Sequence, residues 1–286
     1  MKLITLCAVA AVGVLGSMLC FSVAAEEPEK KPPEKAEPIR MEKEKFTFVR
    51  IRYGAGGRTV HPSDFFGNSP SGVRGARGSW RWRTDYPDSD LNLTARVKEV
   101  LKIEVDPDGK VVELTDPELF RYPFIYIVEP GDLALTDAEV TVLRRYLYGG
   151  GFLMLDDFWG EDEWENMAAQ LKRVFPDREF VDVPRTHPIF HGVFNIPNDL
   201  NLQVPNVGTG TASQYTGITW EREDAQEMHI RGIFDNRKRL MVLATHNTDN
   251  GDGWEREEEN KYYWEHFSEK KAYPLGLNII SYVLKH

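Results

Sequence analysis

Residues 124–157 read FIYIVEPGDLALTDAEVTVLRRYLYGGGFLMLDD, and this stretch decides the fold. The apolar runs 124–128 and 152–155 are uninterrupted, as expected of strands buried on both faces of a sheet. Between them, a capping box at 136–139 opens a segment with apolar residues at helical spacing, and the glycines at 149–151 end it. The stretch therefore predicts a strand, a helix and a second strand parallel to the first.

The alternation of strands and helices continues on both sides of this stretch. Glycines, prolines and other turn residues separate the apolar segments. Residues 46–286 are therefore predicted to form one α/β domain, with an open, mostly parallel sheet and helices on both faces. The other predicted strands cover residues 46–53, 110–114, 179–183, 228–234 and 240–245, and the other predicted helices cover 92–101, 116–120, 161–175 and 274–284.

The N-terminal residues are typical of a targeting segment followed by a linker. Residues 1–25 carry one lysine, an apolar stretch and a final Val23-Ala24-Ala25, as a signal peptide does. The apolar stretch is also long enough for an uncleaved membrane anchor. Residues 26–45 are rich in Pro, Glu and Lys and are predicted to be a disordered linker. We therefore expect an exported protein, in the periplasm or on the outer face of the cytoplasmic membrane.

Cysteine content and charge exclude several classes of function. Both cysteines, Cys7 and Cys20, lie in the signal segment, so the predicted domain has no disulfide, thiol nucleophile or thiolate metal site. The formal net charge of −10 argues against a nucleic-acid partner and against general binding to an anionic membrane. Contact with a membrane is then expected only through the N-terminal segment, if that segment is not cleaved.

Polar residues follow two of the predicted strands. The strand at 152–155 runs into Asp156-Asp157, and the strand at 240–245 runs into the polar segment 246–255. Ligands bind at the carboxyl ends of strands in open parallel sheets, so we predict a shared pocket there, with one of the two neighbouring carboxylates facing it. Asp156, Asp157 and His246 are the candidate catalytic residues. The candidate ligand-binding residues are Asp156, Asp157, Trp159, His246, Asn247, Asp249, Asp252 and Trp254.

The segment after residue 246 approaches the spacing of a calcium loop. Read from Thr248, it has Asn250, Asp252 and Glu259 at the third, fifth and twelfth places. The first place holds Thr where the motif needs Asp, and a strand precedes the segment where an EF-hand has a helix. An ordinary turn network of Asn and Asp is therefore favoured, and no metal site is predicted.

Three other polar patterns are less specific. Pro188 breaks the helical spacing of His187 and His191 and no Glu follows His187, so a zinc site is not predicted and a histidine is expected to order the loop. Arginines alternate with tryptophans over 74–83, as in a stacking surface for phosphates, but the acidic total favours a structural surface paired with acids. The acids at 84–90 are expected to face a site or to cap the next helix, with Asp90 the predicted N-cap.

Several motifs together resemble a known family. Residues 116–124 read DPELFRYPF, 143–157 read LRRYLYGGGFLMLDD, 187–190 read HPIF and 273–278 read YPLGLN. With the loop after residue 246, these segments resemble the bacterial domain of unknown function 4159. The resemblance implies a flavodoxin-like fold similar to class I glutamine amidotransferases and trehalose-utilisation-like proteins, and a place in or near the cell envelope.

The same resemblance bears on mechanism. In that superfold a glycine-rich turn leads into a strand whose end presents the catalytic cysteine. The matching strand here ends in Asp156-Asp157. Because glutaminase chemistry needs a thiolate, the sequence excludes it.

Three hypotheses for function follow from the sequence. The leading one is a ligand-binding domain of the cell envelope for a polyhydroxylated ligand such as a carbohydrate, since carboxylates accept hydroxyl hydrogens and tryptophans stack on sugar rings. The second is a hydrolase that uses a carboxylate, or a carboxylate and a metal, on a similar substrate. The third is a scaffold that binds another envelope protein. No cofactor is identified.

Overall fold

The computed structural model describes residues 45–54, 78–256 and 259–286, and within them seven strands form one sheet. The order is β2-β1-β3-β4-β7-β6-β5. Strands β2, β1, β3, β4 and β7 are parallel, whereas β6 is antiparallel to both of its neighbours. The strands are β1 (Val49–Ile51), β2 (Lys110–Val112), β3 (Phe124–Val128), β4 (Phe152–Asp156), β5 (Val181–Asp182), β6 (His229–Phe234) and β7 (Leu240–His246).

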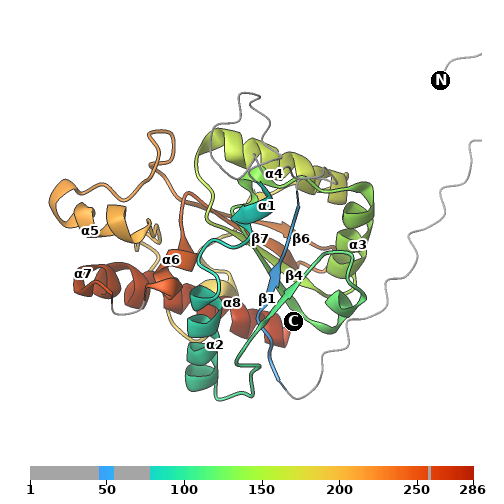
Figure 1. Cartoon of the computed structure of the whole chain (residues 1–286), viewed down its shortest axis with the longest axis horizontal. Coiled ribbons are helices and arrows are strands. Elements are labelled where there is room, and N and C mark those ends of the chain that lie inside the picture. Colours follow the sequence, from blue (N-terminus) through green and yellow to red (C-terminus); the bar gives the residue numbers. More distant parts are fainter. Residues whose placement is uncertain (1–44, 55–77, 257–258) are drawn as a thin grey trace, which may run out of the picture. The chain divides into compact units, whose positions relative to one another are not determined.

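Helices cover both faces of this sheet, as the sequence predicts (Figure 1). The long helices α3 and α4 pack on one face, and α2 and α8 pack on the other. The helices are α1 (Gly78–Arg81), α2 (Asp88–Leu101), α3 (Asp137–Tyr148), α4 (Gly160–Val174), α5 (Val207–Thr216), α6 (Asn250–Glu255), α7 (Lys261–Tyr263), the π-helix η6 (Trp264–Ala272) and α8 (Tyr273–Lys285). The short 3-10 helices are η3 (Pro117–Arg121), η4 (Pro130–Asp132) and η5 (Pro188–Phe190).

The central strands supply both cores because their side chains alternate between the faces of the sheet. In β3, Phe124, Tyr126 and Val128 belong to the core under α2 and α8. Ile125 and Ile127 belong to the core under α3 and α4. A strand that is buried on both faces needs a continuous apolar run, which is the pattern that the sequence of β3 and β4 has.

Local signals in the sequence set several helix ends. Thr136 and Glu139 form the predicted capping box of α3, with the Thr136 Oγ1 atom accepting from the Glu139 N–H at 3.2 Å. The prediction for α2 was wrong at its start. This helix begins at Asp88 after Pro87, and Asp90 is not its N-cap. The Asp90 carboxylate instead accepts from the buried guanidinium of Arg50 at 2.5 Å, because that charge has no solvent to balance it.

Some sequence predictions concern residues outside the described ones. They are the signal peptide at 1–25, the linker at 26–45 apart from its last residue, Lys45, and the arginines at 74 and 77. Among the described helices, none is both long and apolar enough to cross a membrane.

Candidate functional site

Asp156 is the last residue of β4, and its carboxylate links the segments that meet at the carboxyl edge of the sheet. Its side chain is fully buried. It accepts five hydrogen bonds, from Tyr126 Oη at 3.0 Å, Thr245 Oγ1 at 2.5 Å, Asn250 N at 3.0 Å, Asn250 Nδ2 at 2.8 Å and Gly251 N at 3.1 Å. Burial raises the pKa of Asp156, while these donors favour its ionised form and lower the pKa. Asp156 therefore joins β3, β4, β7 and α6.

The next residue, Asp157, points elsewhere. Its φ of 57° lies in the left-handed region, so the chain turns sharply as it leaves β4. The Asp157 carboxylate is buried and accepts from the Trp159 indole at 3.1 Å. Burial raises the pKa of Asp157 well above its usual range, and the charges of Glu221 and Asp156 raise it further.

The loop after β7 adds two more buried acids. Asp249 is the N-cap of α6, and its Oδ1 atom accepts from the Asp252 N–H at 2.7 Å. Asp252 in turn accepts from the Val207 N–H at 2.6 Å. The pKa of Asp249 is raised well above its usual range by burial first, and then by the charges of Asp157 and Asp85.

Asp85 reaches the same place from the segment before α2. One oxygen of Asp85 lies within 4.8 Å of oxygens from Asp157 and Asp249, and a second grouping brings Asp85 together with Asp252 and Glu255. Burial raises the pKa of Asp85 well above its usual range, and Asp157 is the largest of the charges that raise it further. From the sequence, the acids at 84–90 were expected either to face a site or to cap the next helix. The structure places Asp85 with the other acids of the site.

A glycine makes this approach feasible. A Cβ atom at position 251 would lie 2.2 Å from the Asp85 Oδ2 atom, far inside van der Waals contact. Gly251 therefore lets the Asp85 carboxylate approach the first turn of α6. The five converging acids are called the acidic cluster below: Asp85, Asp157, Asp249, Asp252 and Glu255.

The acidic cluster has little compensating positive charge. Among the described residues, no Lys, Arg or His forms an ion pair with Asp85, Asp157 or Asp249. Arg256 pairs with Glu255 at 2.7 Å and lies 3.9 Å from Asp252, at the exposed end of the cluster. The carboxylates of Asp85, Asp157 and Asp249 therefore repel one another where little water is present. This repulsion favours protonation of these groups or the binding of a cation.

His246 and Asn247 are not part of the acidic cluster. His246 is buried, its Nε2 atom pairs with the Gly160 carbonyl at 3.0 Å, and its ring stacks on Phe158. Burial lowers the pKa of His246 to about 4, so the ring is neutral at physiological pH. Asn247 accepts from the Gly160 N–H at 2.9 Å and donates to the Glu227 carbonyl at 2.7 Å. Both side chains hold the start of α4.

The tryptophans near the edge are enclosed. Trp254 is fully buried and packs against Tyr126 with ring centroids 5.9 Å apart. Trp159 is 5% exposed and donates to Asp157. Neither ring presents an open face for a sugar in this structure.

The residues of the calcium-loop pattern are divided between different roles. Asn250 donates to Asp156, and Asp252 belongs to the acidic cluster. Glu259 is exposed and pairs with Arg256 at 3.3 Å. The turn network that the sequence favours is present, since Asp249 caps α6.

The histidine pair and the arginine–tryptophan segment, two of the less specific sequence patterns, have structural roles. The His187 Nδ1 atom accepts from the Ile189 N–H at 3.3 Å, so this histidine orders its loop as predicted. His191 lies 2.7 Å from Asn195 Oδ1 and 2.6 Å from the Arg185 carbonyl. Arg81 forms ion pairs with Glu129 and with Asp132, as expected of an arginine surface paired with acids.

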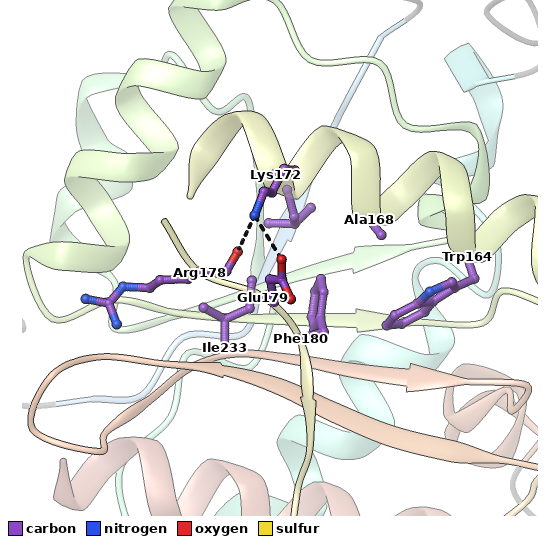
Figure 2. A pocket seen from close by; sticks show the side chains of 8 residues that line it. Trp164, Ala168, Lys172, Arg178, Glu179, Phe180 and Ile233 are labelled. Carbon is purple, nitrogen blue, oxygen red and sulfur yellow. Dashed lines mark hydrogen bonds and ion pairs between the residues drawn. The ribbon is translucent and has the colours of Figure 1, made fainter. Parts of the chain in front are cut away.

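Two hollows lie away from the acidic cluster, and none of its residues lines them. The smaller, of about 170 Å³, opens between α4 and the strand β6 (Figure 2). Its lining is mostly apolar, with Trp164 and Phe180 toward one end. The Lys172 ammonium donates a hydrogen bond to the Glu179 carboxylate at 3.3 Å. The larger, of about 620 Å³, is lined in part by Arg178 and Arg239; Arg178 donates to the Phe234 carbonyl, and Arg239 donates to the carbonyls of Gly151 and Leu147. Neither hollow gathers reactive groups as the acidic cluster does.

Comparison with known proteins agrees with the resemblance noted in the sequence. The family model described as domain of unknown function (DUF4159) matches residues 73–284, which is most of the chain and includes the whole acidic cluster. A search of curated proteins finds no match.

Proposed function

We propose that this chain, which belongs to the DUF4159 family, is an exported ligand-binding domain of the cell envelope whose ligand is held by the acidic cluster. One observation carries the proposal. The carboxylates of Asp85, Asp157 and Asp249 meet within 4.8 Å at the carboxyl edge of the sheet; Asp157 and Asp249 are buried, Asp85 is half-buried, and none forms an ion pair with a described residue. Buried like charges cost stability, so their convergence favours a role in binding.

The ligand class follows from the chemistry of the cluster. Ionised carboxylates accept hydrogen bonds from hydroxyl groups and attract positive charge. A polyhydroxylated ligand such as a carbohydrate therefore fits, held by oxygen atoms and not by stacking, since Trp159 and Trp254 are enclosed. The edge of a parallel sheet, where β4 and β7 end, supports this location because ligands bind there in open α/β sheets.

A glycan array tests the proposal. The wild-type domain is expected to bind a subset of glycans, and Asp157→Asn is expected to lose that signal. Asp108→Asn is the matched control, because it removes the same charge from an exposed turn. Equal signals from the wild type and Asp157→Asn would contradict a site at the acidic cluster.

A second candidate function is a hydrolase for the same ligand class. The observation that favours it is the raised pKa of Asp157 and Asp249, because a carboxyl whose pKa is raised keeps its proton to higher pH and can act as a general acid beside an ionised one. Release of reducing ends from array-positive glycans would support hydrolysis. Stable binding without release would support the binding domain.

The finer fold assignment belongs to the same proposal. We propose a flavodoxin-like, class I glutamine amidotransferase-like fold, supported by the strand order β2-β1-β3-β4. Asp156 then occupies the end of the strand where that fold presents its cysteine. Asp156 here has five donors, which suits a structural acceptor and not a nucleophile.

A further inference from the structure

The inner acids of the acidic cluster have the spacing of ligands around one metal ion. Asp85, Asp157 and Asp249 come from three separate segments, and each offers an oxygen within 4.8 Å of the other two. Oxygens on opposite sides of a bound Ca²⁺ lie roughly 4.6–5.2 Å apart, since each Ca–O bond is roughly 2.3–2.6 Å. This opposite-side distance is the largest that two oxygens of one ion can have, so three oxygens within 4.8 Å of one another can share a single ion once they draw slightly together, with other positions around it left free.

A separate observation concerns hydrogen bonding. Within the described part of the chain, the Asp85 Oδ2 atom is enclosed and has no hydrogen-bond donor, although it lies against the first turn of α6 at Gly251. Asn250, which is fully buried, likewise has an Oδ1 atom to which no described residue donates. Buried oxygens are nearly always satisfied in folded proteins, so an unsatisfied carboxylate aimed into a group of acids indicates a missing positive partner.

The chemistry of these groups selects the kind of ion. All the oxygens are hard ligands, the domain has no cysteine, and His246 bonds to the Gly160 carbonyl away from the cluster. Carboxylate and amide oxygens suit Ca²⁺, Mg²⁺ and Mn²⁺. Mg²⁺ usually takes only one or two carboxylates from a protein, whereas Ca²⁺ takes more, so three carboxylates match Ca²⁺ best.

We infer that Asp85, Asp157 and Asp249 bind one hard divalent cation of the Ca²⁺ type at the carboxyl edge of the sheet. The inference deepens the proposed function, because it concerns the same site. The ion neutralises the mutual repulsion of the three acids, and its free positions accept hydroxyl or carboxylate oxygens of the ligand. A polyol or an acidic sugar then binds through the cation and not through the acids directly.

Thermal unfolding of the full chain tests the inference. The protein is stripped with EDTA, dialysed, and heated with and without 1 mM CaCl₂, with NaCl of equal ionic strength as the reference. At a Ca²⁺ concentration of about 100 times Kd, the melting temperature is expected to rise by roughly 5–10 °C. No rise with CaCl₂ or MgCl₂ would overturn the inference.

Matched variants separate a metal site from a purely structural cluster. Asp85→Asn is expected to melt at a higher temperature than the wild type without metal, because repulsion is relieved, and to lose the Ca²⁺-dependent rise. Asp108→Asn, an exposed acid, is expected to keep the rise in full. A rise in Asp85→Asn equal to that of the wild type would also overturn the inference.

The same samples distinguish this inference from the proposed function. Glycan binding that persists in EDTA, together with no Ca²⁺-dependent rise, leaves the proposed function standing and removes the metal. A Ca²⁺-dependent rise without binding to any glycan retains the metal and removes the carbohydrate. Titration calorimetry with CaCl₂ gives the stoichiometry, with one ion per chain expected for Asp108→Asn and no binding expected for Asp85→Asn.

Discussion

Asp156 and Asp157 are adjacent in the chain and both are buried, yet their surroundings are opposite. Asp156 accepts five hydrogen bonds from three elements, so its charge is distributed over donors that the fold supplies. Among the described residues, the Asp157 carboxylate has one side-chain donor, Trp159, and it faces other acids. The comparison teaches that burial alone does not identify a functional carboxylate. What separates the two is whether the fold provides the partners that a buried charge needs.

The largest expected effect comes from removing the satisfied carboxylate. Asp156→Ala leaves buried donors of Tyr126, Thr245 and α6 without an acceptor, so the free energy of unfolding is expected to fall by about 3–5 kcal/mol. Urea unfolding followed by circular dichroism measures it, with Asp108→Ala as the surface control. A loss below about 1 kcal/mol would break the comparison.

The pH dependence of stability separates the two regions further. The folded-state pKa of Asp249 is raised, so between the unfolded value near 4 and the folded value the folded state binds more protons than the unfolded state. That part of the stability is present at low pH and is lost as pH rises through the folded pKa. Without metal, the wild type is therefore expected to lose more of its free energy of unfolding than Asp249→Asn does as pH rises from 5 to 8.

Urea unfolding in EDTA at both pH values measures this difference. His246 acts in the opposite direction, since its lowered pKa makes stability rise with pH between about 4 and 6.5. Both proteins retain His246, so its contribution cancels in the comparison. Parallel pH profiles would show that Asp249 titrates normally.

A smaller gain is expected at fixed pH. Asn is as good an N-cap as Asp, so Asp249→Asn keeps the cap of α6 while it removes one of the opposing charges. At pH 7.5 without metal, the free energy of unfolding is expected to increase by about 1 kcal/mol. Asp157→Asn tests the same idea without touching a cap, and destabilisation of both variants would contradict the repulsion.

The smallest change in stability is expected at the glycine. Gly251→Ala places a Cβ atom where the Asp85 Oδ2 atom lies, and the carboxylate can move aside. The helix preference of Ala offsets part of the cost, so stability is expected to stay within about 1 kcal/mol of the wild type. The Ca²⁺-dependent rise in melting temperature is nevertheless expected to disappear. An unchanged rise would show that Asp85 need not approach α6.

The sequence predicts the strands and helices that support this site better than it predicts which residues form the site. Continuous apolar runs and the capping box predict β3, α3 and β4, because burial on both faces and a satisfied helix end are local requirements. The carboxyl edge and the pair Asp156-Asp157 follow from the parallel order of the strands. The alternation of side chains along a strand indicates that Asp156 and Asp157 point in opposite directions. It does not indicate which of the two faces the site.

The members that sequence patterns miss are set by tertiary structure. Asp85 approaches the cluster through the path of the chain before α2, which no local pattern encodes. His246 and Trp254 resemble binding residues in sequence, yet both are enclosed by packing that depends on distant segments. Their role in binding a ligand stays a prediction.

The two outer strands of the sheet have a consequence for solubility. On one side β5 is two residues long and ends in Asp182, whose side chain is 82% exposed. On the other side β2 is three residues long and begins with the exposed Lys110. A short outer strand offers few backbone groups with which a strand of another molecule can pair. A charged side chain on that strand would also have to lose its water on pairing, which is unfavourable. The sheet of this acidic protein therefore resists edge-to-edge aggregation at high local concentration.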